Sequence, residues 1–426
     1  MKPGRPDEAG PGPAAGPEPA AGPGPAAGTG GAGGAQPLRV TSLELFFDLV
    51  FAFTLTQLTE LLAGRLSLAG AAQVLLIFGL LWWMYGGYSW LTNNRPPVHT
   101  AERLLLLVGM AGFLTIGLAI PHGFAGDGLE FGLGYLTVVL VHASLYFRVN
   151  IHILRVAPFN IASALLVTIA GLLPQPSGSE GHAAYGLWIA AIVIQLGSTL
   201  IVRPRGLFEL RPEHLVERYT ALVMVALGES VAAIGTGAAE LAGHVGQHSG
   251  QLATVALLGL ALAAALWWIV FGDGDEEEAE RVLTAASSER RTALAMSAYF
   301  TANIPLLLGV VAVATGVQEA IGHAAQLSAR PAAAAVMAVG AALFLAGDVA
   351  FRVQLRTGPV RLRMVAAVMA LATTAVGAAV ALEAQLAVLT AILAAMLILE
   401  RRRAHPGQAG QGRDAAGPPS RDVAAG

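Results

Sequence analysis

The sequence contains no cysteine and a single lysine, Lys2, which lies in a segment rich in proline, glycine and alanine. Without cysteine the chain cannot form a disulfide, a thiolate metal site, an iron–sulfur cluster or a cysteine nucleophile. Without a buried lysine it cannot hold retinal or another carbonyl ligand as a Schiff base. These two absences exclude several classes of enzyme and receptor.

The usual enzyme motifs are absent as well. There is no HExxH zinc motif, no G-x-S-x-G nucleophile motif, and no glycine-rich stretch followed by lysine as in a phosphate-binding loop. His244 and His248 have the spacing of a metal-binding pair on a helix, but the glycines around them disfavour a helix there. We therefore expect no enzymatic activity, no metal, no cofactor and no nucleic-acid partner.

Charge is scarce, whereas apolar residues are abundant. Only 12% of the 426 residues are charged and 55% are hydrophobic, too few charges to cover a soluble surface. The sequence therefore predicts an all-α, polytopic bundle of membrane helices. Apolar runs long enough to cross about 30 Å of hydrocarbon predict twelve helices, at residues 43–62, 68–91, 102–120, 129–149, 156–173, 184–202, 214–236, 251–271, 291–314, 331–353, 362–382 and 384–399. Only Glu383 and Gln385 separate the last two runs, so whether these are separate crossings stays open.

The ends of the chain and the arginines predict the topology. Residues 1–36 and 404–426 have almost no large apolar side chains, and we expect disordered tails that flank a membrane domain at 37–403. The first tail does not resemble a signal peptide, so we expect no cleavage. If the N-terminus is cytoplasmic, 23 of the 25 lysines and arginines lie inside and only Arg65 and Arg330 lie outside. Basic residues accumulate on the cytoplasmic side, so we expect a bacterial inner-membrane protein with both termini in the cytoplasm.

The membrane domain is a candidate for an internal repeat of six helices followed by six, with halves at 37–205 and 206–403. The third run opens with Glu102-Arg103 and the ninth with Glu289-Arg290. Similarly, the fourth run ends in Phe147-Arg148-Val149 and the tenth in Phe351-Arg352-Val353. Acid and base at a helix start also suit the helix dipole and lipid headgroups, so the repeat stays open.

Two acids in the first apolar run are the strongest functional signal. Glu44 and Asp48 are four residues apart in SLELFFDLVFAFTLTQLTELL, so they share one helical face. Ionised groups are costly in hydrocarbon and usually face protein or water. One interpretation is an ion pair with Arg103 or Arg218 that only fastens helices together. The other is a proton or cation site, continued along the same helix by Thr56, Gln57 and Glu60.

A second acid lies deep in the seventh run, where Glu217-Arg218 is followed by Gly228-Glu229-Ser230. Glu229 must be protonated, paired or hydrated at that depth, and it is either a hydrogen-bonded structural residue or part of the same site. Weaker candidates are His142 and the i, i+4 pair Asp348 and Arg352. We expect the aromatic residues to be interfacial anchors, namely Trp82, Trp83, Tyr85, Tyr88, Trp90, Trp267 and Trp268.

These motifs carry a family resemblance. The run from Glu44 to Phe51, Glu-Leu-Phe-Phe-Asp-Leu-Val-Phe, resembles the first-helix signature of the bacterial low temperature requirement A (LtrA) membrane proteins. The Glu217-Arg218 pair and the downstream Leu-Gly-Glu-Ser resemble a second signature of that family. The resemblance extends over about residues 39–399. It implies an integral membrane protein of bacteria, linked by the family name to growth in the cold, with no established reaction.

We favour a transporter of a small solute or ion, linked to protons or cations through Glu44, Asp48 and Glu229, with Arg103 and Arg218 as counter-charges. The alternative is a non-transporting membrane scaffold or lipid-interacting stress factor. A cation channel is a minority alternative, from a looser likeness to potassium channels with an Arg-x-x-x-Phe-Ser-Asp motif; Asp48 follows Arg39 at a different spacing. The lipid bilayer is the expected partner. The sequence indicates neither the solute nor the oligomeric state.

Overall fold

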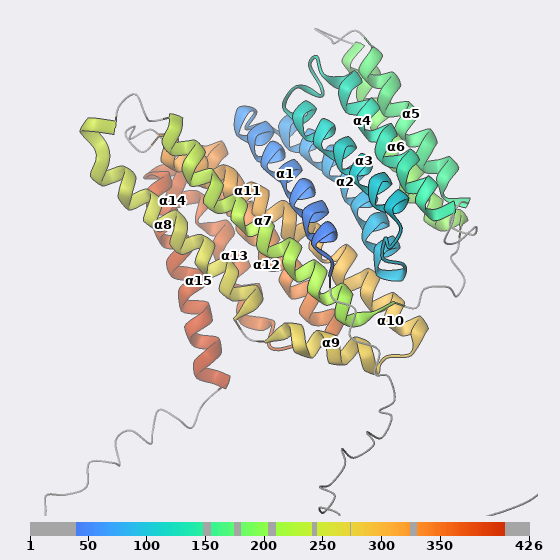
Figure 1. The fold of residues 1–426 in the computed structure, drawn as a ribbon. Helices are drawn as coiled ribbons and strands as arrows, with labels where there is room; N and C mark the ends of the chain where they lie inside the picture. The colour runs from blue at the N-terminus through green and yellow to red at the C-terminus, as the bar shows by residue number, and fades with distance from the viewer. Residues whose placement is uncertain are drawn as a thin grey trace, which may run out of the picture. The chain divides into compact units, whose positions relative to one another are not determined.

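The computed structural model describes residues 40–147, 155–173, 180–202, 210–240, 245–272, 274–323 and 330–404. Within these ranges the chain forms helices and no strand (Figure 1). In chain order they are α1 (Ser42–Gly64), α2 (Leu68–Asn94), α3 (Thr100–Ala119), the 3₁₀ turn η1 (Ile120–His122), α4 (Gly128–Phe147), α5 (Ala157–Leu172), α6 (Glu180–Ile201), α7 (Pro212–Glu240), α8 (Val245–Phe271), α9 (Asp275–Ala285), α10 (Ser288–Ala295), the π-helical turn η4 (Met296–Thr301), α11 (Asn303–Gly322), α12 (Pro331–Leu355), α13 (Arg361–Ala372), α14 (Thr374–Ala379) and α15 (Leu382–Ala404). The predicted tails, apart from Ala404, and the residues Arg148, Val149 and His244 lie outside the described residues.

The predicted class is confirmed. Ten of the described helices are long and apolar enough to cross a membrane, and two shorter apolar helices lie at Ala157–Leu172 and Ala183–Thr199. Every predicted run coincides with a helix, although the ninth is interrupted by η4 and the eleventh is divided at Thr373 into α13 and α14. The last two runs are separate helices. The short helix α9, which opens with four consecutive acids, was not predicted.

Local chemistry fixes where α1 and α2 begin. The Thr41 hydroxyl accepts the backbone N–H of Glu44 (3.3 Å), and the Glu44 carboxylate accepts the backbone N–H of Thr41 (2.9 Å). This capping box satisfies two backbone donors that a helix start leaves free. At the next turn the Ser67 hydroxyl caps α2, and a Cβ on Gly70 would lie only 2.1 Å from the carbonyl oxygen of Arg65. The tight α1–α2 connection therefore requires glycine at position 70.

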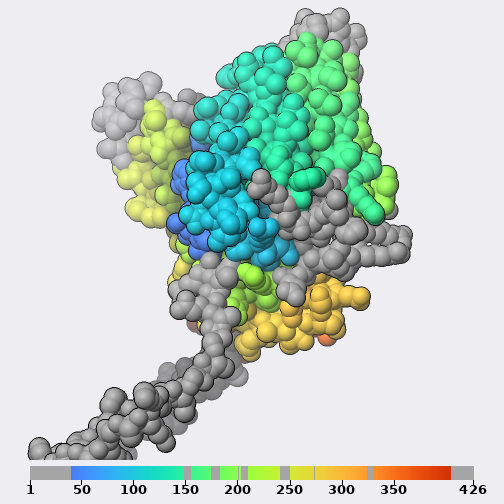
Figure 2. Space-filling view, turned by 45° about the vertical axis from the view of Figure 1, so that its right-hand side comes forward, coloured from blue at the N-terminus to red at the C-terminus, as the bar shows by residue number. Residues whose placement is uncertain are grey.

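Helix α1 lies between two groups of helices. It packs against α2 and α3 on one side and against α7 and α11 on the other (Figure 1). The helices α4, α5 and α6 pack side by side in chain order, and Figure 2 shows their teal and green surfaces adjoining. The largest contacts between the N-terminal helices and the helices from α7 onward are made by α1. Residues on α1 are therefore placed at the boundary of the two groups.

The two groups pack in parallel ways. In the first, α3 packs against α1 and α4, and α4 packs against α5; in the second, α11 packs against α7 and α12, and α12 packs against α13. At the α3–α4 crossing and at the α11–α12 crossing, the two backbones approach each other closely at glycines, as is common between membrane helices. A Cβ on Gly112 would lie 3.0 Å from the Gly134 carbonyl oxygen, and one on Gly309 would lie 2.7 Å from the Gly340 carbonyl oxygen. The six-plus-six repeat stays a prediction, with which these parallels agree.

The aromatic residues of α2 correct an expectation. Trp82, Tyr85, Tyr88 and Trp90 are buried inside the bundle, so their assignment as interfacial anchors is wrong. Since α2 packs against α1, α4, α6 and α7, its aromatic side chains meet protein and not headgroups. Phe51 of α1 packs against Tyr85 with tilted rings whose centroids are 4.3 Å apart, and Tyr85 stacks on Trp82 at 5.4 Å. By contrast, Trp267 and Trp268 of α8 are 40% and 38% exposed, as an anchor requires.

Candidate functional site

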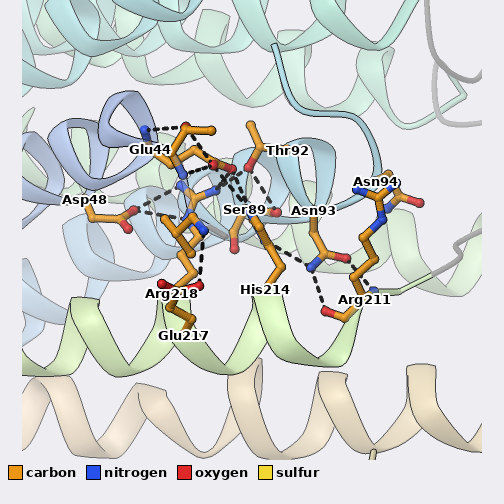
Figure 3. Close-up of polar contacts among 12 residues, drawn as sticks. Glu44, Asp48, Ser89, Thr92, Asn93, Asn94, Arg211, His214, Glu217 and Arg218 are labelled. Atoms are coloured by element: carbon orange, nitrogen blue, oxygen red, sulfur yellow. Dashed lines mark hydrogen bonds and ion pairs between the residues drawn. The ribbon is translucent and has the colours of Figure 1, made fainter. Parts of the chain in front are cut away.

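Helices α1 and α7 bring two i, i+4 pairs face to face. Glu44 and Asp48 of α1 oppose His214 and Arg218 of α7, and we call these four residues the Arg218 cluster (Figure 3). An oxygen of Glu44 lies 3.2 Å from His214 Nε2 and 3.5 Å from Arg218 Nη1. Asp48 Oδ1 accepts hydrogen bonds from Arg218 Nη2 (3.0 Å) and Nε (3.2 Å). All four side chains are at most 1% exposed.

Helix α2 and an aromatic ring of α1 hold the arginine from its other sides. Tyr85 donates its O–H to Asp48 Oδ1 (3.0 Å), and Thr92 accepts a hydrogen bond from Arg218 Nη1. The guanidinium carbon lies 5.7 Å from the ring centroid of Phe47 and 5.6 Å from that of Tyr85, within the range of cation–π attraction. The position of Arg218 is therefore fixed by charge, hydrogen bonds and packing together.

The hydrogen bonds around Asn93 determine the tautomer of His214. Asn93 Oδ1 accepts the backbone N–H of Arg211 (3.0 Å), and Asn93 Nδ2 donates to the carbonyl of Arg211 (3.0 Å), which fixes the orientation of the amide. Asn93 Nδ2 also lies 3.3 Å from His214 Nδ1, and since this amide nitrogen can only donate, Nδ1 must accept. The ring proton is then on Nε2, which donates to Glu44. A neutral His214 satisfies its contacts with Asn93 and Glu44, which Figure 3 shows.

With His214 neutral, the Arg218 cluster is short of one positive charge. Two carboxylates face one guanidinium, which leaves a formal charge of about −1 in a site closed to solvent. Asp48 Oδ2 is buried and has no hydrogen-bond partner among the described residues. A buried carboxylate oxygen without a donor is costly. A proton or a small cation at this oxygen would remove both deficits.

A second polar group lies further along α1. Thr56 donates its O–H to Glu229 Oε2 of α7 (2.5 Å), and Glu229 is buried. One turn on, Glu60 lies 3.4 Å from the side-chain amide of Gln318 in α11. Thr56 is eight residues beyond Asp48, about 12 Å along the helix. The acids predicted from the sequence therefore stand at two depths beside the same helix.

Hollows approach these polar groups from opposite ends of α2. The Thr92 hollow is lined by Thr92, Arg95, Glu102 and neighbouring residues, and Thr92 also bonds Arg218. The Arg65 hollow has a volume of about 230 Å³, and Glu60, Arg65 and Gln73 are among the residues that line it. Gln73 and Leu91, which line different hollows, are about 27 Å apart along α2 by the helical rise. That separation is close to the thickness of the hydrocarbon.

Three sequence candidates lie outside these groups. The predicted pairing of Arg103 with the α1 acids is wrong, because its guanidinium is exposed in the first turn of α3 and donates to the Pro97 carbonyl (3.1 Å). Glu217 is exposed on α7 and accepts the backbone N–H of Val40 (3.1 Å). Gln57 is half-buried, and no described contact ties it to either polar group.

The remaining candidates lie elsewhere in the bundle. His142 is buried between the rings of Tyr88 and Tyr146, with centroids 5.1 and 4.6 Å away. The predicted local contact between Asp348 and Arg352 is present at 3.5 Å, but it belongs to a larger set. Arg363 Nη1 lies 2.7 Å from Asp348 and Nη2 lies 3.1 Å from Glu400, while Arg352 pairs with Asp275. We call these five residues the Arg363 network; it joins α9, α12, α13 and α15, and its members are Asp275, Asp348, Arg352, Arg363 and Glu400.

The sequence analysis missed His214. A signal was available, because His214 and Arg218 have the same four-residue spacing as Glu44 and Asp48. Two acids on one helix and two nitrogen side chains on another, at the same spacing, can meet face to face when the two helices pack together.

Both polar groups lie within a stretch of sequence shared with known proteins. Residues 39–398 match the sequence model of a family described as Bacterial low temperature requirement A protein (LtrA). The chain belongs to the LtrA family. It is also similar to an uncharacterised protein of Rhizobium meliloti (strain 1021), with 30% identity over 322 residues that cover 71% of this chain and 75% of the relative. The matched range includes every residue of the Arg218 cluster, as well as Thr56 and Glu229.

Proposed function

We propose that this LtrA-family protein is a proton- or cation-linked transporter of a small solute, and that the coupling ion binds at the Arg218 cluster. The observation that carries the proposal is the buried charge deficit at Asp48 Oδ2. Protonation of that carboxylate, or a small cation beside it, balances the cluster. Release of the ion restores the deficit, so the occupied and empty states differ in charge where α1, α2 and α7 meet.

The position of the cluster supports the proposal. In transporters built from repeats, ion and solute sites lie between the halves, and the halves move against each other around them. Here the cluster lies at α1, between the two groups of helices. The Thr92 hollow approaches it from one end of α2, and the Arg65 hollow approaches the Glu229 group from the other. A small ion would thus have an approach from each side of the membrane.

The arginine distribution supports an orientation with both termini in the cytoplasm, so that the Thr92 hollow faces inward and the Arg65 hollow outward. Because the natural chain has no cysteine, single Arg65→Cys and Arg103→Cys variants test this directly. Both arginines are exposed. A membrane-impermeant maleimide should label Arg65→Cys in spheroplasts, and Arg103→Cys only after permeabilisation. The reverse pattern would show the opposite orientation.

Flux through purified protein in liposomes tests the transport proposal. Wild type should carry protons or monovalent cations down an imposed gradient, and Glu44→Gln/Asp48→Asn/Glu229→Gln should lose that flux. Glu217→Gln is the matched control, since it neutralises an exposed acid next to Arg218 in sequence. Equal flux from wild type and the triple variant would remove the mechanism. If wild type gives no flux above empty liposomes, and the triple variant only unfolds more easily, the protein is a non-transporting scaffold.

A further inference from the structure

The Arg65 hollow is large enough for a small organic molecule. Its volume of about 230 Å³ far exceeds the roughly 10–15 Å³ that one water needs, and falls just below the roughly 300 Å³ at which drug-sized sites begin. Its polar lining residues are Glu60, Arg65, Gln73 and His122, and Phe124 contributes an aromatic wall. The hollow therefore presents both signs of charge to whatever occupies it.

The two opposite charges do not pair with each other. Within the described ranges, Arg65 Nη1 donates to Gln73 Oε1 (3.3 Å), and Glu60 meets the side-chain amide of Gln318 (3.4 Å). Each charge thus contacts a different glutamine: Arg65 contacts Gln73, which lines the hollow, and Glu60 contacts Gln318 of α11. The bond to Gln73 leaves the guanidinium, which has five N–H donors, with further donors to offer. A carboxylate held by a single amide likewise retains acceptor capacity.

The tether on Arg65 is itself fixed. Gln73 is buried, and its Nε2 donates to the hydroxyl of Tyr185 (2.5 Å). Tyr185 stacks on Phe124 with ring centroids 5.1 Å apart, and Phe124 packs against the tilted ring of Trp188 at 4.7 Å. The aromatic wall and the amide that holds Arg65 are therefore one packed unit. At the rim, His122 lies 3.6 Å from Asp127, and both are substantially exposed.

We propose that the Arg65 hollow binds a small zwitterion of the amino-acid type, with its ammonium at Glu60 and its carboxylate at Arg65. Arginine suits a carboxylate because its planar fork can donate two parallel hydrogen bonds. The wall at Phe124 would pack against the apolar part of the ligand. Glu60 is one turn from Thr56, which bonds the buried Glu229, so the solute site adjoins the deeper acid. That this zwitterion is the transported solute rests on the proposed function, but its binding does not.

Equilibrium dialysis of radiolabelled glycine and proline against the purified full-length protein tests the ligand class. At least one of the two zwitterions should bind saturably. Acetate, methylammonium and glycinamide, which each lack one of the two charges, should compete about tenfold less well or worse, the effect of losing about 1.4 kcal/mol of interaction. Glu60→Gln and Arg65→Gln should each weaken binding about tenfold or more. Arg103 is exposed at the start of α3 and does not line the Arg65 hollow, so Arg103→Gln should leave zwitterion binding unchanged.

Several results would overturn the proposal. Methylammonium competing as well as glycine would make the hollow a cation site, and acetate doing so would make it an anion site. If neither glycine nor proline binds saturably at millimolar concentrations, the proposal is also refuted. Arg65 is exposed at the end of α1, so its variant should keep the wild-type melting temperature even if Glu60→Gln unfolds. Zwitterion binding without proton- or cation-linked flux would refute the proposed function alone; such flux without zwitterion binding would refute only this inference.

Discussion

Arg218→Gln should destabilise the protein far more than Asp48→Asn, although the two residues are partners. Without Arg218, two carboxylates remain buried beside a neutral histidine, and Thr92 loses the hydrogen bond from the guanidinium. Removing one member of a buried ion pair costs about 3–5 kcal/mol because the partner is left uncompensated. The loss of packing against Phe47 and Tyr85 adds to that cost.

Asp48→Asn acts in the opposite direction on the charge. It changes the formal charge of the Arg218 cluster from about −1 to zero, while the side-chain oxygen still accepts from Tyr85 and Arg218. The new amide nitrogen replaces Oδ2, which has no described partner, so one unpartnered polar atom replaces another. Weaker hydrogen bonds and relief of the surplus charge offset each other, and we expect a change within about 1 kcal/mol.

Thermal unfolding of purified protein, followed by size-exclusion chromatography of the soluble fraction, measures both variants. The combination Arg218→Gln/Asp48→Asn should be more stable than Arg218→Gln alone, because the second change removes one of the two uncompensated charges. Contacting residues typically show coupling of about 0.5–3 kcal/mol. An Asp48→Asn variant as unstable as Arg218→Gln, or a double variant less stable than either, would refute the charge count.

Two further predictions concern packing and the second charge network. Gly309→Ala should destabilise the α11–α12 crossing by about 1–3 kcal/mol, since its Cβ would lie 2.5 Å from the backbone nitrogen of Phe344; Gly186→Ala, with no atom within 4 Å, should not lower the melting temperature. Arg363→Gln should cost about 3–5 kcal/mol because it strands two buried acids, whereas Arg281→Gln, which removes an exposed pair with Glu278, should change stability by at most about 1 kcal/mol. Either control matching its test variant would contradict the reasoning.

The helices were predictable because a membrane segment must satisfy its own backbone hydrogen bonds over about 20 apolar residues. The start of α1 was predictable too, since Thr41 and Glu44 form a local capping box. The sequence could not predict which of Arg103 and Arg218 is the counter-charge of Asp48. Either could have reached Asp48 by sequence, and only the packing of α7 against α1 decides for Arg218. Contacts between distant helices leave no local pattern.

One sequence match behind the predicted repeat differs in register from the helix crossings. Glu102-Arg103 and Glu289-Arg290 both open a run, but Glu102 precedes the crossing glycine Gly112 by ten residues and Glu289 precedes Gly309 by twenty. These acids therefore do not occupy equivalent places relative to the crossings. Close approach of helices fixes glycine positions more tightly than headgroup contacts fix charges at helix ends. If the halves are related, their crossing glycines define the alignment.

Solvent access separates the two buried charge sets and explains why only one is proposed to bind an ion. Among the described residues, the Arg363 network holds three acids and two arginines. Its Asp275 is 13% exposed at the start of α9, so water can screen part of its charge. In the Arg218 cluster every charged side chain is at most 1% exposed, and water cannot play that part. Partial solvent access therefore makes the Arg363 network tolerable as structure, whereas for the closed Arg218 cluster we propose that a proton or cation balances the charge.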